Sequence, residues 1–105
     1  MEADGLARAA IVDLDRKEDA GWVSRLADIY RELGLPSPAV TVSGRKGYGI
    51  WLSLEQPTPV GQVRAFLRLL RSVYGLPGEG VDLRPDAIGP TAAAQAVMKL
   101  APALH

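Results

Sequence analysis

The stretch AVTVSGRKGYGIWLSL, residues 39–54, decides the fold. Its first half, Ala39–Ser43, and its second half, Tyr48–Leu54, both alternate between larger apolar residues and smaller or polar ones. Such alternation is typical of β-strands, in which successive side chains point to opposite faces of a sheet. Between the halves lies the glycine-flanked basic segment Gly44–Gly47, which predicts a turn. We therefore expect two strands joined by a turn in the middle of the chain.

An amphipathic helix is predicted on each side of these strands. From about Asp19 to Leu33, and again after Thr58, apolar residues recur every three or four positions. We expect Thr58 to cap the second helix and Pro59 to occupy its first position. Both periodic segments end in a Gly-Leu-Pro run, at residues 34–36 and 75–77, which stops a helix. The predicted apolar stripes consist of Trp22, Val23, Leu26, Ile29, Tyr30 and Leu33 in the first helix and of Val63, Phe66, Leu67, Leu70 and Tyr74 in the second.

Two outer strands and a last helix complete the pattern. The apolar runs Ala9–Asp15 and Val81–Leu83 are typical of strands, and the alanine-rich segment Thr91–Leu100 predicts a helix. The order is therefore strand, helix, strand, strand, helix, strand and a final helix. It predicts one α/β domain (an α+β sandwich) over residues 1–105, with a ferredoxin/RRM-like βαββαβ sheet, two helices on one face and an additional C-terminal helix.

The composition excludes several classes of protein. The 105 residues include 12 basic and 12 acidic side chains, so the overall charge gives no attraction to nucleic acid or anionic membranes. There is no cysteine, which excludes disulfides and thiolate metal sites, and the one histidine is the terminal residue His105. No apolar run reaches bilayer-spanning length, and the N-terminus does not resemble a signal peptide. We expect a cytoplasmic protein without a membrane partner.

The acidic residues of the predicted strands gather on one face. Asp13 and Asp15 lie two positions apart, so both project to the same side of their strand, while Asp82 alternates with apolar neighbours in the last strand. We expect the helices to cover Val12, Leu14, Val40, Val42, Ile50, Leu52, Leu54, Val81 and Leu83. The opposite, open face would carry Asp13, Asp15, Thr41, Ser43, Gly49, Trp51, Ser53 and Asp82. Three carboxylates beside a basic turn suit a metal-dependent phosphoryl-transfer site.

In these residues the chain resembles the archaeo-eukaryotic primase-polymerase superfamily, above all the replication primases of plasmids and phages and the polymerase domain of bacterial end-joining ligases. Val12-Asp13-Leu14-Asp15 matches the Asp-x-Asp pair that ends the family's first strand. Ser43-Gly44-Arg45-Lys46-Gly47-Tyr48 matches its Ser-Gly-x-x-Gly-aromatic run, and Val81-Asp82 matches its later hydrophobic-Asp motif. The resemblance covers about Ile11 to Asp82. The chain departs from the family in two ways: Gly49 stands where the family has histidine, and the chain is shorter than the family's catalytic domains.

The resemblance implies an RRM-like core that transfers nucleotides in DNA replication or repair. It implies that Asp13, Asp15 and Asp82 are catalytic residues which hold Mg²⁺ or Mn²⁺, and that Ser43, Gly44, Arg45, Lys46 and Gly47 bind nucleotide phosphates. The implied partners are a nucleoside triphosphate and DNA, with a replication protein or a missing subunit as a further partner. Because the motif histidine is absent, we expect a minimal or degenerate primase-polymerase-like domain. Its expected activity is metal-dependent nucleotidyl transfer or nucleotide binding, and its status as an enzyme stays open.

Each of these site residues also has a simpler interpretation. Asp15 can start the following helix while Asp13 is merely solvated, and the Ser43–Gly47 turn can be an ordinary hairpin connection. Trp51, expected on the open face, can stack a nucleic-acid base or pack beneath the C-terminal helix. The alternative function is therefore a non-catalytic module: an RRM-like nucleic-acid binder or an interaction module of a replication complex.

Overall fold

The computed structural model describes residues 5–42 and 47–88. Its elements in chain order are strand β1 (Leu6–Leu14), the short 3₁₀ helix η1 (Lys17–Asp19), helix α1 (Gly21–Glu32), strands β2 (Ala39–Val42) and β3 (Tyr48–Pro59), helix α2 (Val60–Tyr74) and strand β4 (Val81–Ala87). The predicted C-terminal helix Thr91–Leu100 and the turn residues Ser43 to Lys46 lie outside the described residues. In residues 5–42 and 47–88, no helix is long and apolar enough to cross a membrane.

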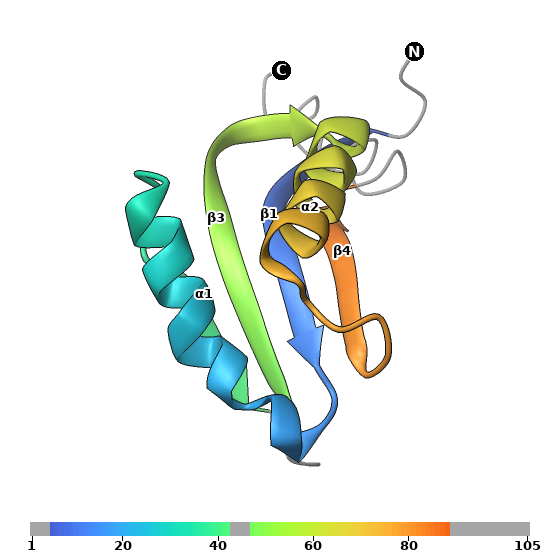
Figure 1. Cartoon of the computed structure of the whole chain (residues 1–105). Helices are drawn as coiled ribbons and strands as arrows, with labels where there is room; N and C mark the ends of the chain where they lie inside the picture. The colour runs from blue at the N-terminus through green and yellow to red at the C-terminus, as the bar shows by residue number, and fades with distance from the viewer. Residues whose placement is uncertain (1–4, 43–46, 89–105) are drawn as a thin grey trace, which may run out of the picture.

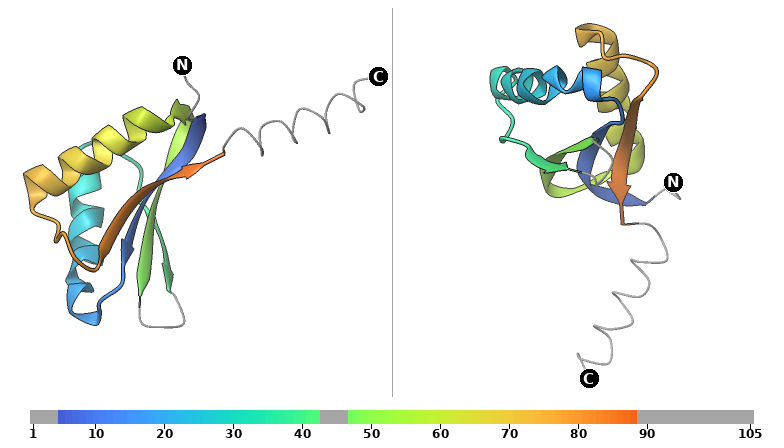
Figure 2. Two further views of the ribbon diagram at one scale, coloured as in Figure 1. Left: turned by 90° about the vertical axis from the view of Figure 1, so that its right-hand side faces the viewer. Right: turned by 90° about the horizontal axis from the view of Figure 1, so that it is seen from below.

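The four strands form one antiparallel sheet in the order β2-β3-β1-β4. Both helices lie on the same side of this sheet, as Figure 1 and the left view of Figure 2 show. An open four-stranded sheet with two helices confirms the predicted α+β class, and the arrangement is compatible with a ferredoxin-like fold. The first strand of the chain is thus an inner strand, with a neighbour on each side.

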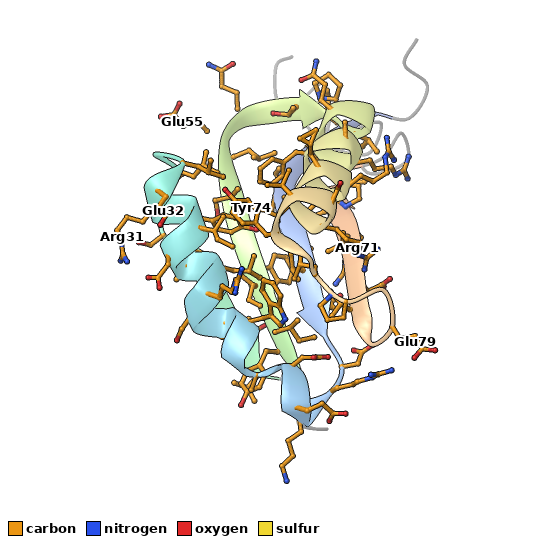
Figure 3. The ribbon with its side chains drawn as sticks, viewed as in Figure 1. Arg31, Glu32, Glu55, Arg71, Tyr74 and Glu79 are labelled. Atoms are coloured by element: carbon orange, nitrogen blue, oxygen red, sulfur yellow. The ribbon has the colours of Figure 1, made fainter. Side chains whose placement is uncertain are left out.

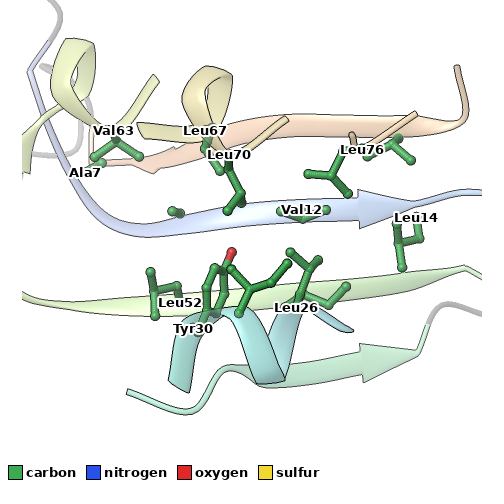
Figure 4. Packing of buried hydrophobic residues seen from close by; sticks show 14 of the residues in the cluster. Ala7, Val12, Leu14, Leu26, Tyr30, Leu52, Val63, Leu67, Leu70 and Leu76 are labelled. Carbon is green, nitrogen blue, oxygen red and sulfur yellow. The ribbon is translucent and has the colours of Figure 1, made fainter. Parts of the chain in front are cut away.

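The core lies between the sheet and the helices. Apolar side chains from β1 and β3 meet the predicted stripes of both helices there (Figure 4). The cluster includes Val12, Leu14, Ile50 and Leu52 from the strands and Leu26, Ile29, Tyr30, Val63, Leu67 and Leu70 from the helices. The hydrophobic partition predicted for the central strands is therefore confirmed, because alternate residues of a strand share one face.

The predicted burial of β2 under the helices is wrong. Val40 and Val42 pair with Ile50 and Tyr48, so they lie on the predicted face of the sheet. Both nevertheless remain exposed, Val42 to 70%. The reason is that α2 packs over β1, β3 and β4, whereas β2 is the edge strand at the far end of the sheet, a position that the sequence alone does not reveal.

The predicted start of the second helix is also wrong. Thr58 and Pro59 belong to β3, and α2 begins at Val60 without a side-chain cap. The N-terminal end of β1 accounts for this, since Leu6 pairs with Pro59 and Ala7 with Thr58, which keeps both residues extended. The Thr58 hydroxyl donates to the carbonyl of Gln56 at 2.9 Å instead of capping the helix.

The end of α2 follows the prediction. Gly75 has φ 78° and a left-handed conformation, and its N–H closes the helix by donating to the carbonyl of Arg71. The Arg71 side chain reaches from α2 toward β4, where its Nη2 donates to the carbonyl of Val81 at 2.7 Å (Figure 3). This contact fastens the second helix to the first residue of the last strand.

Candidate functional site

One row of residues crosses the sheet where β1 ends. The register pairs Thr41 with Gly49, Gly49 with Asp13, and Asp13 with Asp82. Residues that face each other across antiparallel strands share one face of the sheet. Asp13 and Asp82, far apart in the chain, therefore lie opposite each other on the face without helices.

A small hollow of about 130 Å³ lies at this end of the sheet. Both members of the Asp-x-Asp pair, Asp13 and Asp15, line it, together with Gly47 from the glycine-basic motif. Its remaining lining residues are Leu14, Thr41, Val42, Tyr48 and Gly49. Asp82 is not among the lining residues, although it pairs with Asp13. Ser43, Gly44, Arg45 and Lys46 lie outside the described residues.

Asp13 is bound by an arginine that the sequence analysis missed. The Nε atom of Arg84 donates to Oδ2 of Asp13 at 2.8 Å, and the two side chains are 46% and 28% exposed. Arg84 follows Asp82 by two positions in β4, so strand alternation places it on the same face. The two-residue period of the strand could have placed Arg84 on this face from the sequence. Its pairing with Asp13, however, depends on the order of the strands in the sheet.

The space above Gly49 is filled by two neighbouring side chains. A β-carbon at position 49 would lie 2.6 Å from Oγ1 of Thr41 and 3.0 Å from Nε1 of Trp51. Trp51 Nε1 donates to Thr41 Oγ1 at 3.2 Å, and the Thr41 hydroxyl in turn donates to the Gly49 carbonyl at 3.5 Å. Gly49 is thus covered by a Thr41–Trp51 bridge.

Trp51 belongs to the next row of the same face. This row pairs Ala39 with Trp51, Trp51 with Ile11, and Ile11 with Arg84. The indole is partly exposed, so part of an aromatic ring is available on the predicted face. The C-terminal helix that the alternative interpretation places over Trp51 lies outside the described residues.

In the part of the chain that the structure describes, no group of three or more His, Cys, Asp or Glu residues is placed to hold a metal ion. Asp13 and Asp15 supply hard oxygen ligands of the kind that Mg²⁺ and Mn²⁺ prefer, but one Asp13 oxygen already accepts from Arg84. A cation there would need further ligands from a nucleotide or from water.

The comparisons with known proteins add no relative. No protein-family model matches this chain, and no match was found among curated proteins or among solved structures.

Proposed function

We propose that this chain is a minimal, degenerate primase-polymerase-like domain of the RRM-like type, which binds a nucleotide with a divalent cation at the end of its sheet. The observation that carries the proposal is the shared hollow of Asp13, Asp15 and Gly47. Both acids of the Asp-x-Asp pair and one residue of the glycine-basic motif line it, although the two motifs lie far apart in the sequence.

The chemistry of the hollow suits phosphate bound through a metal ion. Asp13 and Asp15 would hold Mg²⁺ or Mn²⁺, which in turn would neutralise the phosphates of a nucleoside triphosphate. In the sequence, the basic residues Arg45 and Lys46 directly precede Gly47. The opposed pair Asp13 and Asp82 makes the row acidic, which favours a cation over a bare phosphate.

The Thr41–Trp51 bridge supports binding rather than efficient catalysis. It occupies the space that the family's histidine side chain would need at position 49. A domain with this bridge would hold its nucleotide without that phosphate contact. We therefore propose nucleotide binding as the principal activity and nucleotidyl transfer as weak at best.

Amide NMR provides the test. Addition of Mg²⁺ and then of dATP should shift the signals around Asp13, Asp15 and Gly47, and the Asp13→Asn/Asp15→Asn double variant should not respond. Asp28→Asn, which alters an exposed acid on α1, serves as the matched control and should respond like the wild type. Absence of any shift at millimolar ligand in the wild type would reject the proposal, and a positive result would justify primer-extension assays on DNA.

A second candidate function is non-catalytic binding of single-stranded nucleic acid, favoured by the partly exposed indole of Trp51. A base stacked on an aromatic side chain contributes about 1–3 kcal/mol. Binding of a labelled oligothymidylate without metal should then weaken roughly 5- to 150-fold in Trp51→Ala, which corresponds to that energy, and should survive in Trp51→Phe. Trp22→Phe, on α1, is the control. Equal affinities for all variants would exclude stacking on Trp51.

A further inference from the structure

We propose that Arg84 is an internal counter-ion that takes the place of a divalent cation at Asp13, so that its charge sets how weakly this domain binds metal. The inference rests on the proposed function, because it concerns the cation of the same hollow. It assigns to Arg84 a regulatory role that none of the sequence motifs suggests.

The geometry of Arg84 is the first argument. Its register partner across the sheet is Ile11, yet its guanidinium reaches one row along β1 to Oδ2 of Asp13 at 2.8 Å. The Arg84 side chain therefore contacts the carboxylate of Asp13 diagonally across the two strands. Asp13 is the more buried member of the pair, at 28% exposure. An arginine held against a largely covered carboxylate occupies oxygen lone pairs that a metal ion would otherwise use.

The charges around Asp13 supply the second argument. Asp13 lies directly opposite Asp82, and like charges that face each other across two strands destabilise a sheet. Asp15 lines the same hollow. This cluster of acids needs positive charge nearby, and Arg84 delivers it without any ligand. A divalent cation would do the same, so the guanidinium and the metal ion compete for one carboxylate.

The sheet contains a matched control for this pair. Arg8 of β1 donates through Nε to Oδ2 of Asp86 in β4 at 3.1 Å, the same type of contact between the same two strands. The two pairs differ in their surroundings. Asp86 is not among the residues that line the hollow, whereas Asp13 shares it with Asp15. Removal of the Arg8 charge should therefore leave Asp86 without its arginine partner but should not improve the binding of a cation in the hollow.

The experiment is a Mn²⁺ titration of the intact chain, followed by paramagnetic broadening of amide signals, for the wild type, Arg84→Gln, Arg84→Lys and Arg8→Gln. Loss of one positive charge at contact distance from the Asp13 carboxylate, which is 28% exposed, should tighten Mn²⁺ binding by roughly tenfold in Arg84→Gln. Arg84→Lys keeps the charge and should stay close to the wild type. Arg8→Gln should also match the wild type.

Three outcomes are distinguishable. A roughly tenfold gain confined to Arg84→Gln supports the inference. Measurable binding that is equal in the wild type and Arg84→Gln, or equally improved in Arg8→Gln, overturns the inference and leaves the proposed function standing. No broadening around Asp13 in any of the four proteins at millimolar Mn²⁺ overturns both.

Thermal unfolding gives a second readout that does not depend on NMR. A ligand that binds only the folded state raises the melting temperature by mass action. Millimolar Mn²⁺ should therefore raise the melting temperature of Arg84→Gln more than that of the wild type, and Asp13→Asn in the Arg84→Gln background should abolish the difference. An equal Mn²⁺ effect on Arg84→Gln and on Asp13→Asn/Arg84→Gln would contradict a cation site at Asp13.

Discussion

The hydroxyl of Thr41 stands 2.6 Å from the point where a β-carbon on Gly49 would lie. Gly49 is an inner residue of the open face, and the close approach arises because Thr41 is its direct partner across β2 and β3. A glycine at this position is thus required by its neighbour's hydroxyl and by the indole that binds it, not by the conformation of the strand.

Gly49→Ala should destabilise the domain by about 1–3 kcal/mol, because the new methyl group forces Thr41 and Trp51 apart. Part of this loss should return when Thr41→Ala removes the crowding hydroxyl. Urea denaturation of the two single variants and the double variant forms the cycle that measures it. Additive effects would show that the two residues do not interact, and Gly49→His would then need no compensating change at position 41.

Gly75→Ala should lower the free energy of unfolding by about 1–2 kcal/mol, for a reason other than crowding. The residue closes α2 with φ 78°, a conformation that a side chain disfavours although no atom lies within 4 Å of the β-carbon position. Gly61, inside the same helix and equally open, provides the opposite case. Gly61→Ala should stabilise the protein by about 0.5–1 kcal/mol through helix propensity. A gain in stability from both substitutions would contradict the closing role of Gly75.

Leu67 and Leu69, two positions apart on α2, test the position of the core. Leu67 is buried against the sheet, whereas Leu69 is 61% exposed. Leu67→Ala should therefore lower the free energy of unfolding by about 2–5 kcal/mol, while Leu69→Ala should change it by less than about 0.5 kcal/mol. Thermal or urea denaturation distinguishes them readily. Similar losses for both variants would mean that α2 is rotated from the described orientation.

Tyr30 makes stability depend on pH at the alkaline end. Burial raises the pKa of Tyr30 to about 12, and its hydroxyl has no hydrogen-bond partner within the described residues. An unfolded tyrosine ionises near pH 10, so the folded state keeps a proton that the unfolded state loses. The contribution of Tyr30 to the free energy of unfolding is therefore fully present below about pH 10. It falls as the pH rises, and the loss reaches about 2–3 kcal/mol at pH 12.

Tyr30→Phe should remove that part of the pH dependence and should be neutral or stabilising at pH 7, because it deletes a buried hydroxyl without a partner. Urea denaturation at pH 7, 9.5 and 11 measures the effect, with Tyr74→Phe as the control. A Tyr30→Phe variant that loses as much stability as the wild type between pH 9.5 and 11 would refute the assignment.

Local patterns predicted most of the fold. The apolar stripes around Leu26 and Leu67 and the alternation around Ile50 are each set by a few neighbouring residues, so their elements were found from the sequence. Thr58 and Pro59 were misassigned because they resemble the start of a helix locally, whereas in the structure they pair with the N-terminal end of β1 and stay extended. The sequence of a strand does not by itself show which residues of other strands will pair with it.

The candidate site shows the same division. Strand alternation was enough to place Asp13 and Asp82 on the open face. It could not show that Arg84 would bind Asp13, since that contact depends on β4 lying beside β1. Nor could it show that Thr41 would cover Gly49, which requires the register between β2 and β3. Contacts across strands are set by topology, and topology is a property of the whole chain.

The inner position of β1 has a consequence for how the domain is made. Among the four described strands, β1 is synthesised before the others, and its neighbours β3 and β4 are the last two of the four. The apolar strand therefore has no sheet partner until β3 has left the ribosomal exit tunnel, and one of its edges stays unpaired until β4 follows. Chains dominated by such distant pairings fold slowly and expose unpaired strands on the way. If synthesis stalls before Val81, the edge of β1 that β4 would cover stays unpaired. We expect such a nascent chain to need a chaperone more than the finished domain does.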